Sequence, residues 1–102
     1  MKAVKVQYTV KEDYVETNKK NIKQVMSELK ELNNAGIKYS SYILNDGKTF
    51  VHLGIYSDEA AMTVVTSLDS FKKFQMGLKE SRPEAPPQSD DLNLVASAYD
   101  IF

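Results

Sequence analysis

The sequence contains no cysteine and no tryptophan, and it has only one histidine, three prolines and four glycines among 102 residues. Without cysteine there is no disulfide framework, no thiolate nucleophile and no cysteine-ligated metal site. A single histidine also excludes an all-histidine metal site. The sequence therefore predicts a fold that forms without metal, cofactor or disulfide bonds.

Neither basic nor acidic residues predominate, and the sequence has no long apolar run. Thirteen basic residues against fourteen acidic ones give a net charge of -1 without a basic tract, which argues against nucleic acid as a partner. No apolar run is long enough for a membrane span or a signal peptide, so we expect a cytoplasmic protein without membrane contact. Hydrophobic residues make up 42%, which suits one folded domain over residues 1–102.

The first third of the chain changes its hydrophobic period once. Residues 3–10 alternate and predict a strand with one apolar face, formed by Val4, Val6, Tyr8 and Val10. From Tyr14 to Leu32 apolar residues recur at steps of three and four, which predicts an amphipathic helix of about five turns. Gly36, in the cluster that follows, is typical of a helix C-terminus.

Residues 37–44 and 49–56 predict a β-hairpin around Asn45-Asp46-Gly47-Lys48. A two-residue Asp-Gly turn would pair Asn45 with Lys48, whereas a three-residue turn with a bulge at Gly47 would pair Leu44 with Lys48. The bulged register gathers the aliphatic residues on one face, so it is the favoured one: Ile37, Tyr39 and Ile43 with Val51, Leu53 and Ile55.

The second half of the chain predicts a helix, a break, a second helix and a last strand. Ser57 is a suitable helix cap, and Asp69-Ser70 interrupts the apolar stripe before it resumes through Lys79. Residues 81–91 hold all three prolines and predict an extended linker. Residues 92–101 then predict the closing strand.

The order strand, helix, strand, strand, helix, strand predicts an α+β, ferredoxin-like βαββαβ fold, with a four-stranded antiparallel sheet and both helices on one face. The favoured hairpin register leaves an aromatic patch on the other face, formed by Tyr42, Phe50, His52, Gly54 and Tyr56. Exposed patches of this kind mark interfaces or ligand pockets. We therefore expect a homodimer that packs sheet against sheet.

Two segments resemble a known family. Thr49–Tyr56 with the following residues 57–61, and Ser70–Gln75, resemble the third strand and a helix segment of the antibiotic-biosynthesis-monooxygenase-like group of dimeric α+β barrels. A small uncharacterised subgroup is similar over four shorter segments: residues 8–11, the predicted helix that contains Asn18, residues 46–52 and Pro86-Pro87. The resemblance implies a homodimeric barrel with a cleft between sheet and helices in each subunit. Family members include cofactor-free oxygenases of phenols, haem-degrading enzymes, isomerases and proteins of no known activity.

Three positions depart from the family pattern. Gly54 and Tyr56 stand where the third strand often carries an acidic residue and a tryptophan, and Ser70 replaces a histidine of the helix segment. Gly54 has no side chain for acid–base chemistry, so its expected effect is a larger cleft. Ser70 is no haem ligand, which argues against haem degradation.

The candidate catalytic residue is His52, because its ordinary pKa suits proton transfer near neutral pH. The alternative is a structural histidine that bonds a backbone carbonyl or lies at the dimer seam. Tyr42 and Tyr56 are candidates for binding a ligand oxygen, and their alternative is packing at the interface. Phe50 lies in the same patch and is a further candidate for the ligand pocket.

The helices supply the other pocket candidates. Phe71, Phe74 and Met76 would form an apolar wall, although helical spacing makes ordinary core the favoured interpretation. Asn18 interrupts an apolar stripe, either to reach the cleft or to bond a neighbouring backbone group, and the second is favoured. The pair Asp90-Asp91 is best explained as solvated acids rather than a metal site.

Two functions fit these residues. The first is an enzyme, such as a cofactor-independent monooxygenase, that acts on a small aromatic or enolic compound with His52 as base and Tyr42 or Tyr56 as hydrogen-bond donors. The second is a non-catalytic binding or structural homodimer of the same fold. Single-stranded RNA binding on the sheet is disfavoured, because the strand lacks the basic-glycine-aromatic pattern and the chain is acidic.

Overall fold

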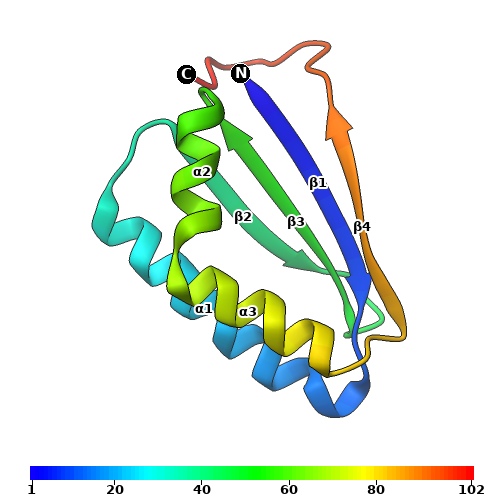
Figure 1. The fold of residues 1–102 in the computed structure, drawn as a ribbon. Helices are drawn as coiled ribbons and strands as arrows, with labels where there is room; N and C mark the ends of the chain where they lie inside the picture. The colour runs from blue at the N-terminus through cyan, green and yellow to red at the C-terminus, as the bar shows by residue number, and fades with distance from the viewer.

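The computed structural model describes residues 1–102 and has the predicted ferredoxin-like α+β architecture. Four antiparallel strands form one sheet in the order β2-β3-β1-β4, and the helices cover one of its faces (Figure 1). The elements are β1 (Lys2–Thr9), a 3-10 turn η1 (Glu12–Tyr14), α1 (Val15–Leu32), β2 (Ile37–Ile43), β3 (Thr49–Tyr56), α2 (Glu59–Ser67), α3 (Asp69–Glu80) and β4 (Ala85–Leu92).

The helices begin and end close to where the sequence predicts. Helix α1 ends at Asn33, which, rather than the predicted Gly36, takes the left-handed conformation with φ of 49°. Asp58, rather than the predicted Ser57, caps α2 by accepting a hydrogen bond from the Ala61 N–H. The break between α2 and α3 lies at Leu68, whose extended backbone turns the chain one residue before the predicted Asp69-Ser70.

The predicted hairpin register is wrong by one residue. Ile43 pairs with Phe50 and Ile37 with Tyr56, which is the register of the turn that the apolar pattern disfavoured. The cause lies in the loop, where the Asp46 carboxylate accepts hydrogen bonds from the backbone N–H groups of Lys48 and Thr49 and from the Thr49 hydroxyl. Because side chains alternate along a strand, this one-residue shift exchanges the two faces of β3 relative to β2.

The exchange turns the predicted outer patch inward. Phe50, His52 and Tyr56 are buried beneath the helices, on the same face as Tyr8 of β1. The opposite face carries the half-buried aliphatic residues of β3, namely Val51, Leu53 and Ile55. Of the five residues predicted to form an aromatic outer face, only Tyr42 remains outside, 57% exposed.

Gly54 does not enlarge a cleft, contrary to the prediction. A Cβ atom added at Gly54 would overlap the hydroxyl and ring of Tyr56, two residues along the same face. The space above the glycine is therefore filled by the tyrosine side chain, and the small residue allows Tyr56 to be buried.

The last strand also differs from the prediction. Strand β4 runs through the segment 81–91 that was expected to be a linker, and residues 93–102 have no regular structure. Pro86 and Pro87 are tolerated because β4 is an edge strand, and they fall where its register against β1 shifts, between the pairs formed by Gln7 and Thr9. The chain then returns across the end of the sheet (Figure 1). There the Phe102 ring lies 5.6 Å from the Lys38 ammonium.

Replacing Gly54 by alanine should destabilise the protein by about 1–3 kcal/mol, because the new methyl group displaces the Tyr56 ring. Urea unfolding of G54A against the unsubstituted protein measures the loss. In the background of Tyr56→Leu, which removes the ring atoms that the methyl group meets, the same substitution should cost less. Equal costs in the two backgrounds would contradict this packing.

Candidate functional site

A chain of hydrogen bonds joins four elements of the fold beneath the helices. The Asn18 Nδ2 group on α1 donates to the Tyr8 hydroxyl on β1 at 2.9 Å, and that hydroxyl lies 2.7 Å from Nε2 of His52 on β3. On the other side of the imidazole, Nδ1 lies 2.9 Å from the Tyr39 hydroxyl on β2. Asn18, Tyr8 and His52 are each at least 97% buried, so these polar groups depend on one another for hydrogen bonds.

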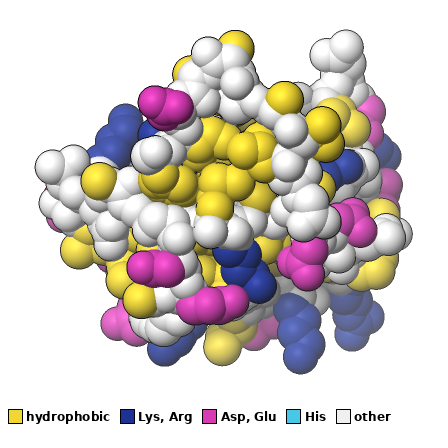
Figure 2. Space-filling view, turned by 90° about the horizontal axis from the view of Figure 1, so that it is seen from above, with side chains coloured by type: hydrophobic (Ala, Val, Ile, Leu, Met, Phe, Trp, Pro, Cys, Tyr) yellow, Lys and Arg dark blue, Asp and Glu magenta, His cyan; other side chains and the backbone are white.

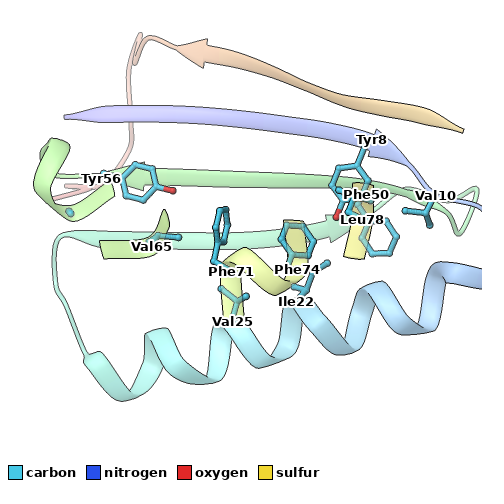
Figure 3. Packing of buried hydrophobic residues seen from close by; sticks show 11 residues of the cluster. Tyr8, Val10, Ile22, Val25, Phe50, Tyr56, Val65, Phe71, Phe74 and Leu78 are labelled. Carbon is cyan, nitrogen blue, oxygen red and sulfur yellow. The ribbon is translucent and has the colours of Figure 1, made fainter. Parts of the chain in front are cut away.

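Aromatic rings enclose this chain. Tyr8 stacks on Phe50 with 5.6 Å between the ring centroids, and His52 lies 5.2 Å from Phe74. Phe71 meets Tyr39 edge-on at 6.4 Å. Figure 3 shows Phe71 and Phe74 between the sheet and α1, with Tyr8 and Phe50 beside them. The imidazole thus lies in a largely apolar environment.

The direction of each hydrogen bond follows from the donor at one end. An amide nitrogen only donates, so the Tyr8 oxygen accepts from Asn18 and the single Tyr8 proton is left for Nε2 of His52. The neutral imidazole then carries its proton on Nδ1 and donates it to the Tyr39 oxygen. The Tyr39 proton is not used within the chain.

Burial sets the protonation states of these groups. Desolvation lowers the pKa of His52 from 6.5 to about 4, so the imidazole is neutral at pH 7. Desolvation also raises the pKa of Tyr8 above its ordinary value, against a smaller opposing effect of the Asn18 hydrogen bond, and it raises the pKa of Tyr39. Both phenols are therefore protonated, and the hydrogen-bonded side chains carry no charge.

The chain ends at the wall of an open pocket. Directly around His52, the side chains of α1 and α3 leave a volume of about 0 Å³. Tyr39, however, also borders a pocket of about 290 Å³ between the C-terminal end of α1 and β2; its other lining residues are Met26, Leu29, Lys30, Asn33, Asn34 and Ile37. Tyr39 is the only member of the hydrogen-bond chain that lines this pocket.

The structure brings together five of the predicted site residues: Asn18, His52, Phe50, Phe71 and Phe74. Tyr56 is buried at the far end of the same core (Figure 3), while Tyr42 and Met76 are exposed. Asn18 bonds the Tyr8 side chain and not a backbone group, contrary to the favoured prediction.

Sequence reasoning missed Tyr8 and Tyr39 as members of the site. Tyr8 stands in the apolar stripe of the first strand, and a tyrosine in a buried stripe needs a partner for its hydroxyl. This requirement, combined with the polar Asn18 in the next apolar stripe, could have indicated the pair. Tyr39 had no comparable indication, because its face depends on the hairpin register.

Two wider features of the residues bear on cofactors and membranes. No group of three or more histidine, aspartate or glutamate side chains is arranged to hold a metal ion. No helix has both the length and the apolar character that crossing a bilayer requires.

The buried imidazole predicts a specific loss of stability in acid. The unfolded chain takes up a proton near the ordinary pKa of 6.5, whereas the folded chain resists protonation until about pH 4. The free energy of unfolding should therefore be unaffected by His52 above pH 6.5 and fall by about 1.4 kcal/mol per pH unit below it. The total loss is on the order of 3 kcal/mol.

Urea unfolding of H52Q and of the unsubstituted protein across this pH range measures the effect. H52Q should be less stable at neutral pH, because it cannot satisfy both tyrosine hydroxyls, but its stability should fall less steeply between pH 6.5 and pH 4. Carboxylates titrate in both proteins and cancel in the comparison. Parallel profiles would show that His52 is not buried in neutral form.

No protein-family model and no curated protein sequence matches the chain. Solved structures do match over nearly its full length. A candidate antibiotic biosynthesis monooxygenase from Bacteroides thetaiotaomicron superposes with a TM-score of 0.82 at 16% identity, over 97% of this chain and 93% of that one.

Two further solved structures superpose on nearly the whole chain. Rv0793 from Mycobacterium tuberculosis has a TM-score of 0.79 at 15% identity, over 96% of this chain and 98% of its own. A protein named antibiotic biosynthesis monooxygenase has a TM-score of 0.75 at 12% identity, over 94% and 100%. At such low identity the likeness concerns the fold and carries no activity or substrate. The chain therefore shares the ferredoxin-like α+β fold of these three solved structures.

Proposed function

We propose that this protein is an enzyme that binds a small phenolic or enolic compound in the pocket between α1 and β2. The main support is the buried hydrogen-bond chain that ends at that pocket and consists of Asn18, Tyr8, His52 and Tyr39. Burying an imidazole and two phenols is costly unless every group is paired, and an apolar core would hold the fold without that cost. A polar chain from the core to a pocket wall therefore favours a chemical role.

The proposed reaction begins with proton transfer. In the imidazole tautomer whose Nδ1 carries no proton, the ligand hydroxyl or enol passes its proton to the Tyr39 oxygen while the Tyr39 proton moves across 2.9 Å to Nδ1 of His52. The low pKa of His52 opposes this step in the empty site. A ligand anion beside the new imidazolium offsets the desolvation, because an opposite charge nearby favours the charged form of the imidazole.

The second step needs only molecular oxygen. An enolate has electrons to reduce O₂, so the carbon that carried two hydrogens in the keto form becomes a carbonyl that keeps one oxygen atom. The other oxygen leaves as water with the remaining hydrogen of that carbon and the proton held by His52. The chain's own residues then have to stabilise the anion and exclude water, for which Lys30 and the apolar Met26, Leu29 and Ile37 of the pocket are suited. The names of the solved structures with this fold agree with such chemistry in those proteins.

Oxygen uptake with a panel of enolisable polycyclic ketones that carry a CH₂ group tests the proposal. His52→Gln should lower kcat/KM by about 100-fold or more, the usual contribution of a general base. Tyr39→Phe, which breaks the only link between pocket and imidazole, should lower it by about tenfold or more. The matched control is Tyr99→Phe, which removes an exposed hydroxyl in the C-terminal segment and should leave the rate unchanged.

An alternative function is a non-catalytic homodimer whose polar chain only specifies the packing of the core. The lack of free volume around His52 favours this alternative. It predicts that no compound of the panel is turned over and that H52Q changes stability alone.

We further propose that the protein is a homodimer joined through the sheet face opposite the helices. That face carries Val51, Leu53 and Ile55, with Lys5 and Asp90 directly opposite each other beside them. Hydrophobic side chains also gather, bordered by charged ones, at the end of the molecule that carries both termini (Figure 2). The exposed apolar residues of the C-terminal segment, Leu94, Val95 and Phe102, add to the surface that a second copy would cover.

Leu53→Arg should convert the dimer to a monomer in sedimentation equilibrium, because it places a charge in the centre of the proposed interface. Met76→Arg, on the exposed face of α3, is the control and should leave the mass unchanged. A dimer that persists in L53R, or a monomer in the unsubstituted protein, would contradict the interface.

A further inference from the structure

The Asn18 side chain uses only one of its two polar groups in the buried hydrogen-bond chain. Its amide nitrogen donates to Tyr8 at 2.9 Å, whereas its carbonyl oxygen has no hydrogen-bond partner although the residue is 0% exposed. Buried amide oxygens are nearly always paired, so this one requires an explanation.

The orientation of this amide determines what the far end of the chain can do. With the nitrogen facing Tyr8, each group passes its proton toward the pocket, and the Tyr39 oxygen accepts from Nδ1 of His52. Tyr39 then meets a ligand as a hydrogen-bond donor, which suits a carbonyl or an anion. In this direction the Nδ1 position is already protonated and cannot take a proton from Tyr39.

We propose that Asn18 is a positioning residue whose amide, by a half-turn about its Cβ–Cγ bond, reverses the direction of the whole hydrogen-bond chain. After the half-turn the Asn18 carbonyl accepts from Tyr8, the Tyr8 oxygen accepts from Nε2–H of His52, and Nδ1 accepts from Tyr39. The role of this reversal in catalysis rests on the proposed function, whereas the reversal itself does not.

Only the reversed chain can act as a base toward the pocket. The ligand O–H bond breaks as a new O–H bond forms on Tyr39, and the original Tyr39 O–H bond breaks as the Nδ1–H bond of His52 forms. The products are a ligand anion and an imidazolium whose Nε2–H remains bonded to Tyr8. Restoring the first direction after the proton has left returns a Tyr39 that donates to the product carbonyl.

Both directions fit the same atomic positions. The three contacts lie between 2.7 and 2.9 Å, a separation that suits either atom as donor. The amide nitrogen and oxygen of asparagine have nearly the same size, so the half-turn needs no repacking of the core. Each orientation leaves one side of the amide unpaired, which keeps the two directions close in free energy.

The imidazole tautomer in the ligand-free protein tests the reversal directly. His52 is the only histidine in the sequence, so the two ring nitrogens of ¹⁵N-labelled protein give an unambiguous nuclear magnetic resonance spectrum. The unsubstituted protein should carry its proton mainly on Nδ1. In Asn18→Asp, at mildly alkaline pH, the carboxylate can only accept from Tyr8, and the proton should move mainly to Nε2.

Asn18→Leu fills the site but neither donates nor accepts a hydrogen bond, so it should give a mixture of both His52 tautomers. If the aspartate variant does not fold, this variant alone tests whether Asn18 sets the tautomer. The matched control is Ser70→Ala, which removes another buried and unpartnered polar atom and should keep the proton on Nδ1.

An unchanged tautomer in both Asn18 variants, or an equal change in S70A, would overturn the proposal. Because no ligand is used, these outcomes are separate from a failure to find turnover. If His52 is the base but Asn18 does not set the direction, H52Q loses activity while the tautomer stays fixed in the Asn18 variants.

Discussion

The hydroxyl of Tyr8 is the point on which three elements of this fold depend. It accepts a hydrogen bond from Asn18 of α1, contacts Nε2 of His52 on β3, and belongs to a ring that stacks on Phe50. Because the residue is 2% exposed, water cannot replace either partner. A change at Tyr8, Asn18 or His52 leaves buried polar atoms unpaired, so β1, α1 and β3 are held in one arrangement by a single oxygen.

The same burial connects stability to chemistry. The aromatic rings that exclude water from His52 lower its pKa to about 4 and keep the site uncharged. A neutral imidazole offers one donor and one acceptor, and its two tyrosine partners use both. Whether Tyr39 donates or accepts at the pocket therefore depends on which ring nitrogen of His52 holds the proton. In our proposal, the orientation of the Asn18 amide at the other end of the hydrogen-bond chain sets that position.

One loop residue decides which side chains form this site. Asp46 holds the hairpin in its register through hydrogen bonds to the next residues of the loop, and these bonds lower the pKa of its carboxyl, that from the Thr49 hydroxyl most. With the register shifted by one residue, Tyr39 and His52 would no longer share a face. In the observed register, the opposite face carries the aliphatic residues of β3. The surface offered to a second copy is therefore aliphatic and not aromatic as predicted.

The order of the elements, the approximate limits of the helices and the ferredoxin-like architecture could be predicted from the sequence alone, because hydrophobic periodicity and helix caps are local properties. It also indicated His52, Asn18 and the phenylalanines of α3 as unusual or apolar positions. Only the tertiary structure decided the hairpin register, the strand in the proline-rich segment and the membership of Tyr8 and Tyr39 in the site. These depend on contacts between distant residues: β4 is held by its pairing with β1, and the two tyrosines by an imidazole more than ten residues away in the chain.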